Sequence, residues 1–337
     1  MSQKVKEKAK AVRSENPIRF REFGMFLTIV IVSALVQYRN PNFLTLENIN
    51  NLLTNTAILS ILAVGMMLVI ITRGIDLSLG ATLALSGMIS ALTVAAYQGL
   101  HPLLAMLLGT VIGAFCGSIV GLLVSKGGVL PIIASLGMMN VYRGLTYIIS
   151  GGKWVSSYQM PASFKDIATG KVLGINRLIF IAIIIYIIAY YFVNYTRTGR
   201  QIYAVGSNPE SAKISGINTI KIVFLVYIIM GALSGLAGVL WVSKFASAQG
   251  DTAVGYEMSV IAACVLGGVS MSGGSGKISG VIMGSILLGI INNALPLIKV
   301  SPFWQSAIHG LIILAAILIN TYVKRRVDKN NLNRRKI

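Results

Sequence analysis

Long apolar runs alternate with short polar stretches along almost the whole chain. Each run holds about 20 residues, the length that an α-helix needs to cross the roughly 30 Å apolar core of a bilayer. The runs are continuous in Leu, Ile, Val and Ala and do not alternate in polarity, so they predict helices and not barrel strands. We expect about ten spans, near residues 23–38, 52–71, 77–97, 102–124, 129–150, 177–194, 221–243, 257–271, 278–298 and 303–323.

The composition agrees with this pattern. Hydrophobic residues make up 55% of the 337 residues and charged residues only 12%, whereas a soluble domain has roughly 25% charged residues. This balance excludes a soluble enzyme, a disordered chain and a small secreted disulfide scaffold. The predicted fold class is all-α, a polytopic transmembrane helix bundle. Cys116 and Cys264 both lie inside apolar runs without the spacing of a metal site, so we interpret them as packing residues.

Positive charge collects at the two ends of the chain. The formal net charge is +19, and residues 1–22 and 324–337 each contain seven of the 29 basic residues. Because basic segments stay in the cytoplasm, we expect two cytoplasmic tails, an even number of spans and a transmembrane domain over residues 23–323. Basic tails can bind nucleic acid, but contact with the anionic inner leaflet is favoured. The first apolar run lacks a cleavage site and is predicted to remain as a helix.

The connection at 195–220 is predicted to face the cytoplasm and to contain a short helix. Asn208 is suited to cap this helix, Pro209 to its first position and Glu210 to its first turn. Gly216 is suited to end it about two turns later. So short a helix is not stable alone in water, so we expect it to dock against another element or protein. An ordinary connecting helix without a function is the alternative.

Three separated segments resemble the permease subunits of ribose/monosaccharide-type ABC importers, in the branched-chain amino-acid/sugar permease superfamily. Residues 206–217 resemble the coupling helix, a variant of the importers' Glu-Ala-Ala…Gly signature with Ser211 in place of the first Ala. Residues 71–80 and 266–276 resemble two further hallmarks of that branch. The coupling residues that the resemblance implies are Gly206, Asn208, Pro209, Glu210, Ala212, Gly216 and Ile217.

The resemblance implies a type II ABC-importer-like fold that moves a monosaccharide or sugar-like solute inward. The implied partners are a second permease copy (in a homo- or heterodimer), cytoplasmic ATPase subunits and an extracytoplasmic solute-binding protein, all at a bacterial inner membrane. No catalytic residue, metal or cofactor is implied. Residues 273–279 superficially resemble a phosphate loop, but Met271 and Ile278 stand where a Walker A motif needs Gly and Ser/Thr. We therefore expect ATP hydrolysis in separate subunits.

Two glycine-rich segments suggest an internal repeat. Gly74–Gly80 resembles Gly268–Gly274, and an apolar run follows each segment. Paired glycine-interrupted segments in the two halves of a chain often mark a transporter's pathway. The span count places both segments at the cytoplasmic side, which predicts a parallel repeat. An inverted repeat, or a pair of simple tight turns, is the alternative.

Polar residues in or beside the spans are candidates for the translocation path. Arg73 and Asp76 are expected to bond each other, to cap the next helix or to contact solute. Neutral amides suit a neutral sugar because they both donate and accept hydrogen bonds, although bonds between helices explain them as well. The candidates are Arg73, Asp76, Ser78, Asn140, Arg143, Ser270, Ser272, Asn292 and Asn293.

Glycines recur at every fourth position of the fourth apolar run. Gly109, Gly113, Gly117 and Gly121 share one face of the predicted helix. Such a stripe lets two helix backbones approach closely. It therefore predicts tight packing against another helix, either of this chain or of a partner subunit.

Other functions are less well supported. An ion- or proton-coupled secondary transporter would need paired acidic or histidine groups within its spans. The chain has only ten acidic residues, most of them in tails or loops, and two histidines. A membrane enzyme would need a cluster of His and Asp that the sequence does not show. An ABC permease for amino acids is the nearest alternative.

Overall fold

The computed structural model describes residues 17–301 and six later positions (304, 307, 310, 311, 314 and 318). The predicted tail at 324–337, and most of the tail at 1–22 and of the run at 303–323, lie outside the described residues. The described chain is almost entirely helical. Its strands are β1 (Lys171–Val172) and β2 (Ile175–Asn176), which form one small antiparallel hairpin. The predicted helical membrane bundle is confirmed.

Eight of the described helices are long and apolar enough to cross a membrane. They are α2 (Pro17–Arg39), α3 (Leu46–Ile71), α4 (Leu79–Ala96), α5 (Pro102–Ser125), α6 (Pro131–Ser150), α8 (Arg177–Tyr195), α11 (Thr219–Phe245) and α13 (Ile278–Leu297). The shorter helices are the 3-10 turn η1 (Ser157–Gln159), α7 (Ala162–Thr169), α9 (Arg197–Ser207), α10 (Pro209–Ile214) and α12 (Tyr256–Leu266).

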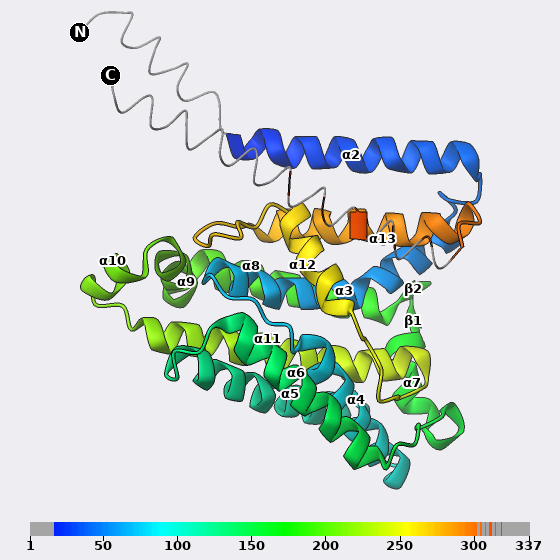
Figure 1. Cartoon of the computed structure of the whole chain (residues 1–337). Coiled ribbons are helices and arrows are strands. Elements are labelled where there is room, and N and C mark those ends of the chain that lie inside the picture. The colour runs from blue at the N-terminus through cyan, green and yellow to red at the C-terminus, as the bar shows by residue number, and fades with distance from the viewer. Residues whose placement is uncertain are drawn as a thin grey trace, which may run out of the picture.

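The connecting elements give the bundle two distinct ends. Helices α9 and α10 lie at one end, and α7 with the β1–β2 hairpin lies at the other (Figure 1). We call these the α10 end and the α7 end. Helix α2 begins at the α10 end, where the Glu22 carboxylate accepts hydrogen bonds from the Lys277 ammonium and the Ser279 hydroxyl at 3.0 Å each. The start of α2 is thus tied to the start of α13.

Two of the crossings are interrupted partway through the bundle. After α3 reaches the α10 end, residues 72–78 return without helical structure before α4 begins (Figure 1). After α11 reaches the α7 end, residues 246–255 return in the same way before α12 begins. Helix α12 has 11 residues, about 16 Å at roughly 1.5 Å per residue, or half of a bilayer core. The continuous span predicted at 257–271 is therefore wrong, because residues 246–255 supply the other half of that crossing.

The two interrupted crossings belong to an inverted repeat. Helix α5 packs along α11 as α13 packs along α3, and α4 contacts α11 as α12 contacts α3. Helix α3 runs toward the α10 end, whereas α11 runs away from it (Figure 1). The predicted pairing of Gly74–Gly80 with Gly268–Gly274 is therefore wrong. The counterpart of residues 72–78 is the segment 246–255, and Gly268–Gly274 is the turn between α12 and α13.

The glycine stripe of α5 packs against α11 of the same chain. A Cβ atom on Gly113 would lie 2.1 Å from the carbonyl oxygen of Gly231, and one on Gly117 would lie 2.2 Å from that of Tyr227. Gly109 and Gly121 also lie in this contact, against Gly235 and Phe224. The stripe packs tightly in this structure, and its partner is a helix of this chain.

Replacing Gly113 with Ala should destabilise the bundle by about 1–3 kcal/mol, because the added methyl group must push α5 away from α11. Thermal unfolding of the detergent-purified protein measures the effect. Gly137 is the matched control, since it lies on the exposed face of α6 with no atom within 4 Å of an added Cβ. Gly137→Ala should be neutral or slightly stabilising. Equal stability of the two variants would contradict the close packing.

Candidate functional site

The short helix α10 has the caps that its sequence predicts. The Asn208 side chain accepts a hydrogen bond from the backbone N–H of Ser211 at 3.0 Å, and Pro209 occupies the first turn. At the other end Gly216 has a φ of +79°, and the N–H of Ile217 donates to the carbonyl of Ala212 at 3.0 Å. The left-handed glycine thus satisfies the last carbonyls of the helix. The predicted boundaries are confirmed to within two residues.

Helix α10 protrudes from the α10 end of the bundle (Figure 1). Ala212 is buried against the body of the protein, and Ile217 is half-buried. Glu210 and Lys213 are exposed, and the apolar side chain of Ile214 is 87% exposed. Helix α10 is therefore held on one face and presents an apolar side chain to solvent on the other, which is the arrangement of a docking element.

Helix α9 joins α10 to the bundle, and sequence reasoning missed it as a helix. Thr196 caps it by accepting a hydrogen bond from the N–H of Gly199 at 3.0 Å. The Tyr203 hydroxyl donates to the carbonyl of Gly276 at 2.7 Å. Burial raises the pKa of Tyr203, so its hydroxyl stays a donor at neutral pH. The polar and apolar residues of Arg197–Ser207 alternate with a helical period, the signal that could have identified this helix.

Three chain segments meet at the junction of α9 and α10. The backbone of Gly206 lies so close to the end of α3 that a Cβ atom would be 1.8 Å from the carbonyl oxygen of Ile71. The same carbonyl accepts a hydrogen bond from the N–H of Gly274 at 2.9 Å. Residues 71–73, 206–207 and 273–274 therefore form one tight contact, which we call the three-segment junction. All three segments that carry the family resemblance contribute to it.

Arg73 fastens this junction. Its backbone has a φ of +66°, and its Nε donates to the carbonyl of Gly206 at 2.7 Å. Its Nη2 donates to the carbonyl of Ser207, the last residue of α9. A cation at the C-terminus of a helix is also favoured by the helix dipole. Of the alternatives that the sequence left open, a bond between Arg73 and Asp76 is not formed, since the hydrogen bonds of the Arg73 side chain go to α9.

Asp76 and Ser78 organise the start of α4. One oxygen of the buried Asp76 carboxylate accepts hydrogen bonds from the Ser78 N–H at 2.9 Å and the Ser78 hydroxyl at 2.6 Å. Just beyond, a Cβ on Gly80 would lie 2.7 Å from the carbonyl of Ala253 and 3.0 Å from a carboxylate oxygen of Glu257. The N-terminal ends of α4 and α12 therefore meet inside the bundle, an arrangement that transporters use around their pathway.

The remaining candidates of the predicted path are distributed over the bundle. Arg143 donates from Nη1 to the carbonyls of Gly250 and Thr252 at 2.8 and 2.7 Å, so it holds the second interrupted segment. Asn140 is exposed on α6 and bonds only the carbonyl of Leu136, in its own helix, among the described residues. Ser270 and Ser272 lie in the turn between α12 and α13, next to the three-segment junction and not at mid-depth.

The two neighbouring asparagines of α13 have different environments. Asn293 and Asn48 exchange two amide hydrogen bonds of 3.0 Å each, which tie α13 to the start of α3. Asn293 therefore makes the helix-to-helix bond that the sequence left open. The side-chain amide of Asn292 makes no hydrogen bond within the part of the chain that the structure describes, and it lines a hollow near the α7 end of α3, α11 and α13.

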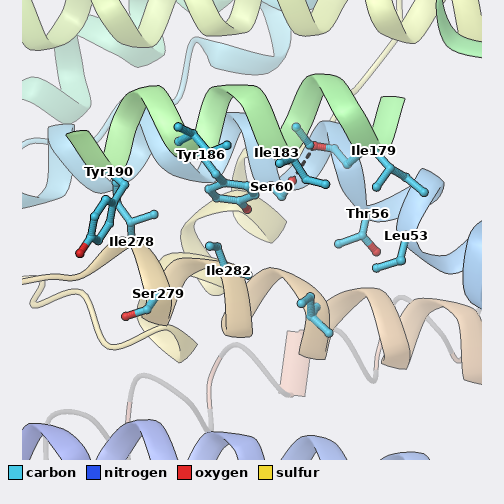
Figure 2. A pocket seen from close by; sticks show the side chains of 14 residues that line it. Leu53, Thr56, Ser60, Ile179, Ile183, Tyr186, Tyr190, Ile278, Ser279 and Ile282 are labelled. Carbon is cyan, nitrogen blue, oxygen red and sulfur yellow. Dashed lines mark hydrogen bonds between the residues drawn. The ribbon is translucent and has the colours of Figure 1, made fainter. Parts of the chain in front are cut away.

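One hollow in the described structure is an apolar groove of about 500 Å³. Helices α8 and α13 form its walls and α3 its floor, with Ile183 and Ile282 on opposite sides (Figure 2). The few polar groups include the hydroxyls of Tyr186 and Ser60. A polyhydroxylated solute would leave most of its hydroxyls without partners in this groove, so its lining argues against a sugar site.

Comparisons with known proteins extend these observations. The family described as "Branched-chain amino acid transport system / permease component" matches residues 48–317. The ribose import permease protein RbsC of Escherichia coli (strain K12) is 39% identical over 296 residues, which cover 87% of this chain and 92% of that protein. RbsC of Bacillus subtilis (strain 168) is 41% identical over 297 residues, covering 88% and 90%.

A third relative is named for another sugar. The D-allose transport system permease protein AlsC of Escherichia coli (strain K12) is 34% identical over 306 residues, covering 90% of this chain and 93% of that protein. No solved structure matches the chain.

Arg73→Ala should loosen α9 and α10 without unfolding the bundle, because it removes two charge-assisted hydrogen bonds that fasten the three-segment junction. Amide hydrogen exchange over residues 203–216 should become about tenfold faster, as expected from a loss of about 1.5 kcal/mol. Arg200→Ala is the matched control, since Arg200 is an exposed arginine of α9. Unchanged exchange in Arg73→Ala would show that the junction does not depend on Arg73.

Proposed function

The chain belongs to the family of branched-chain amino acid transport system permease components, and we propose that it carries a monosaccharide or sugar-like solute inward as the membrane subunit of an ABC importer. The names of its ribose and allose relatives support this class of solute. The observation that carries the proposal is α10, a protruding helix whose base is fastened to an interrupted crossing. Another subunit can displace such a helix, and the helix can transmit this displacement to the membrane helices.

The energy for transport comes from ATPase subunits that dock on α10. The exposed Ile214, with Glu210 and Lys213 beside it, supplies an apolar contact framed by charges of both signs. An exposed apolar anchor with a charged rim is typical of protein interfaces. The buried face around Ala212 transmits a displacement of α10 to the bundle.

The displacement of α10 is transmitted through the three-segment junction. The Gly206 backbone rests directly on the Ile71 carbonyl, so α10 cannot shift toward the bundle without moving the end of α3 or the segment 72–78. That segment leads within a few residues to Asp76 and the start of α4. Closely packed elements transmit displacement because they do not compress. A shift of α10 would therefore alter the place where the ends of α4 and α12 meet, and so open or close a path there.

We further propose that the α10 end is cytoplasmic. Helix α2 begins at that end, and the chain before it is rich in lysine and arginine, which favours a cytoplasmic location. The α7 end then faces outward, where α7 and the β1–β2 hairpin offer a surface for a solute-binding protein. A second permease copy completes the importer. Since α11 occupies the glycine stripe of α5, that copy uses another face.

Gly216→Val should uncouple transport from ATP hydrolysis. A β-branched residue is strained at a φ of +79°, by about 1–2 kcal/mol, which is enough to disrupt a helix of six residues. In proteoliposomes with the ATPase and binding-protein subunits, uptake should fall at least tenfold while ATP hydrolysis continues.

Gly216→Asn provides the matched control, because asparagine tolerates the left-handed conformation. It should keep uptake within about twofold of the wild type, given the small strain. Normal uptake by Gly216→Val, or equal loss in both variants, would count against the role of α10 in coupling.

A further inference from the structure

A second hollow, of about 260 Å³, lies between the outer parts of four helices. Its walls come from α3, α11 and α13, and its floor from the start of α12, one of the two helix ends that meet inside the bundle. Typical pockets for drug-sized ligands have roughly 300–1,000 Å³. This hollow is therefore suited to a smaller molecule, of the size of a single sugar ring.

Three aromatic rings form an apolar side of this hollow. Trp241 lies edge-on to Tyr256, with ring centroids 5.2 Å apart and planes at 83°. Trp241 also packs against Phe245, with ring centroids 4.9 Å apart and planes at 47°. The rings hold one another in fixed orientations. A rigid aromatic wall offers a flat apolar surface to the C–H face of a sugar ring.

The polar groups of the hollow are poorly matched by protein partners. Lys244 donates to the Asn55 side-chain oxygen at 2.7 Å, which leaves the Asn55 amide N–H₂ free of hydrogen bonds to the described residues. Among the same residues, the Asn292 amide, the Trp241 indole N–H and the Tyr256 hydroxyl make no hydrogen bond. The hollow thus holds unused donors and acceptors around an aromatic wall, and no carboxylate from the described residues lines it.

We propose that this hollow is a monosaccharide-binding site within the permease itself, which we call the Trp241 site. The proposal rests on the proposed import function and adds the place where the solute is held. The aromatic wall covers one face of the sugar ring, while Asn55, Asn292 and Lys244 bond its hydroxyl groups. Amides serve a polyol well because one group both donates and accepts. The apolar groove between α8 and α13 lacks this combination.

The position of the Trp241 site suits a place where the solute is bound during inward transport. Lys244 and Phe245 are at the last turn of α11, next to the segment 246–255. Tyr256 begins α12, whose N-terminal end meets that of α4. A solute held here touches the second interrupted crossing, so movement of that crossing would release it.

The test uses the importer complex with its ATPase and binding-protein subunits in proteoliposomes, and measures initial uptake of labelled D-ribose and D-allose at saturating binding protein. Uptake of neither sugar by the wild type would refute the proposed solute class, separately from the site. Asn292→Ala and Trp241→Phe should lower uptake about five- to tenfold, as expected from the loss of one hydrogen bond to a sugar. Each should also change the ratio of the two sugars' rates at least threefold.

Asn194→Ala is the matched control, since Asn194 is exposed on α8 and bonds the carbonyl of Tyr190 in its own helix. It should leave both rates and their ratio unchanged. A fold defect lowers both rates together, so an unchanged ratio in both site variants would overturn the proposal.

A second measurement does not depend on uptake. Asn292→Cys should react with a polar maleimide, and a saturating concentration of the better-transported sugar should slow the reaction at least threefold. Both native cysteines are buried, so background labelling should be low. Labelling at the same rate with and without the sugar would also overturn the site.

Discussion

The contact between the Gly206 backbone and the Ile71 carbonyl constrains the whole α10 end of the protein. Any side chain at position 206 would overlap that carbonyl, since even a Cβ atom would lie 1.8 Å away. Glycine therefore lets α9 rest directly on the end of α3, and Arg73 fastens the two together. This junction holds the base of α10, a helix too short to be stable alone in water. The junction therefore gives a displacement of α10 a direct route to the end of α3.

The junction matters because the first interrupted segment, residues 72–78, starts there. Backbone without helical structure inside a membrane must be covered by protein, since its polar groups have no water to bond. Asp76 and Arg143 provide such cover by bonding the two interrupted segments. The inverted repeat brings the ends of α4 and α12 together, so the two segments meet where a path can form. A movement at the α10 end can thus displace the ends of α4 and α12 inside the bundle, because few residues separate them from the three-segment junction.

Much of this organisation could be predicted from sequence, and the exceptions have physical reasons. Helix length and apolar continuity fix the spans, and the capping preferences of Asn208 and Gly216 fix α10. The half-span of α12 is hard to recognise because the turn after it contains further apolar residues, Val269 and Met271, which resemble a continuation of the helix. The pairing of the repeat goes wrong because glycine composition marks turns of any kind, whereas inversion depends on helix direction. The hydrogen bonds of Arg73 join segments more than 130 residues apart, which no local pattern encodes.

The central claim is that α10 and the three-segment junction move as one unit. Spin-label distances in the complete importer test it directly, with labels at Lys213 on α10, Met271 in the α12–α13 turn beside the three-segment junction, and Leu107 on α5, all exposed positions. On ATP binding, the Lys213–Met271 distance should stay constant while the Lys213–Leu107 distance changes. A change between Lys213 and Met271 with no change relative to Leu107 would contradict the account.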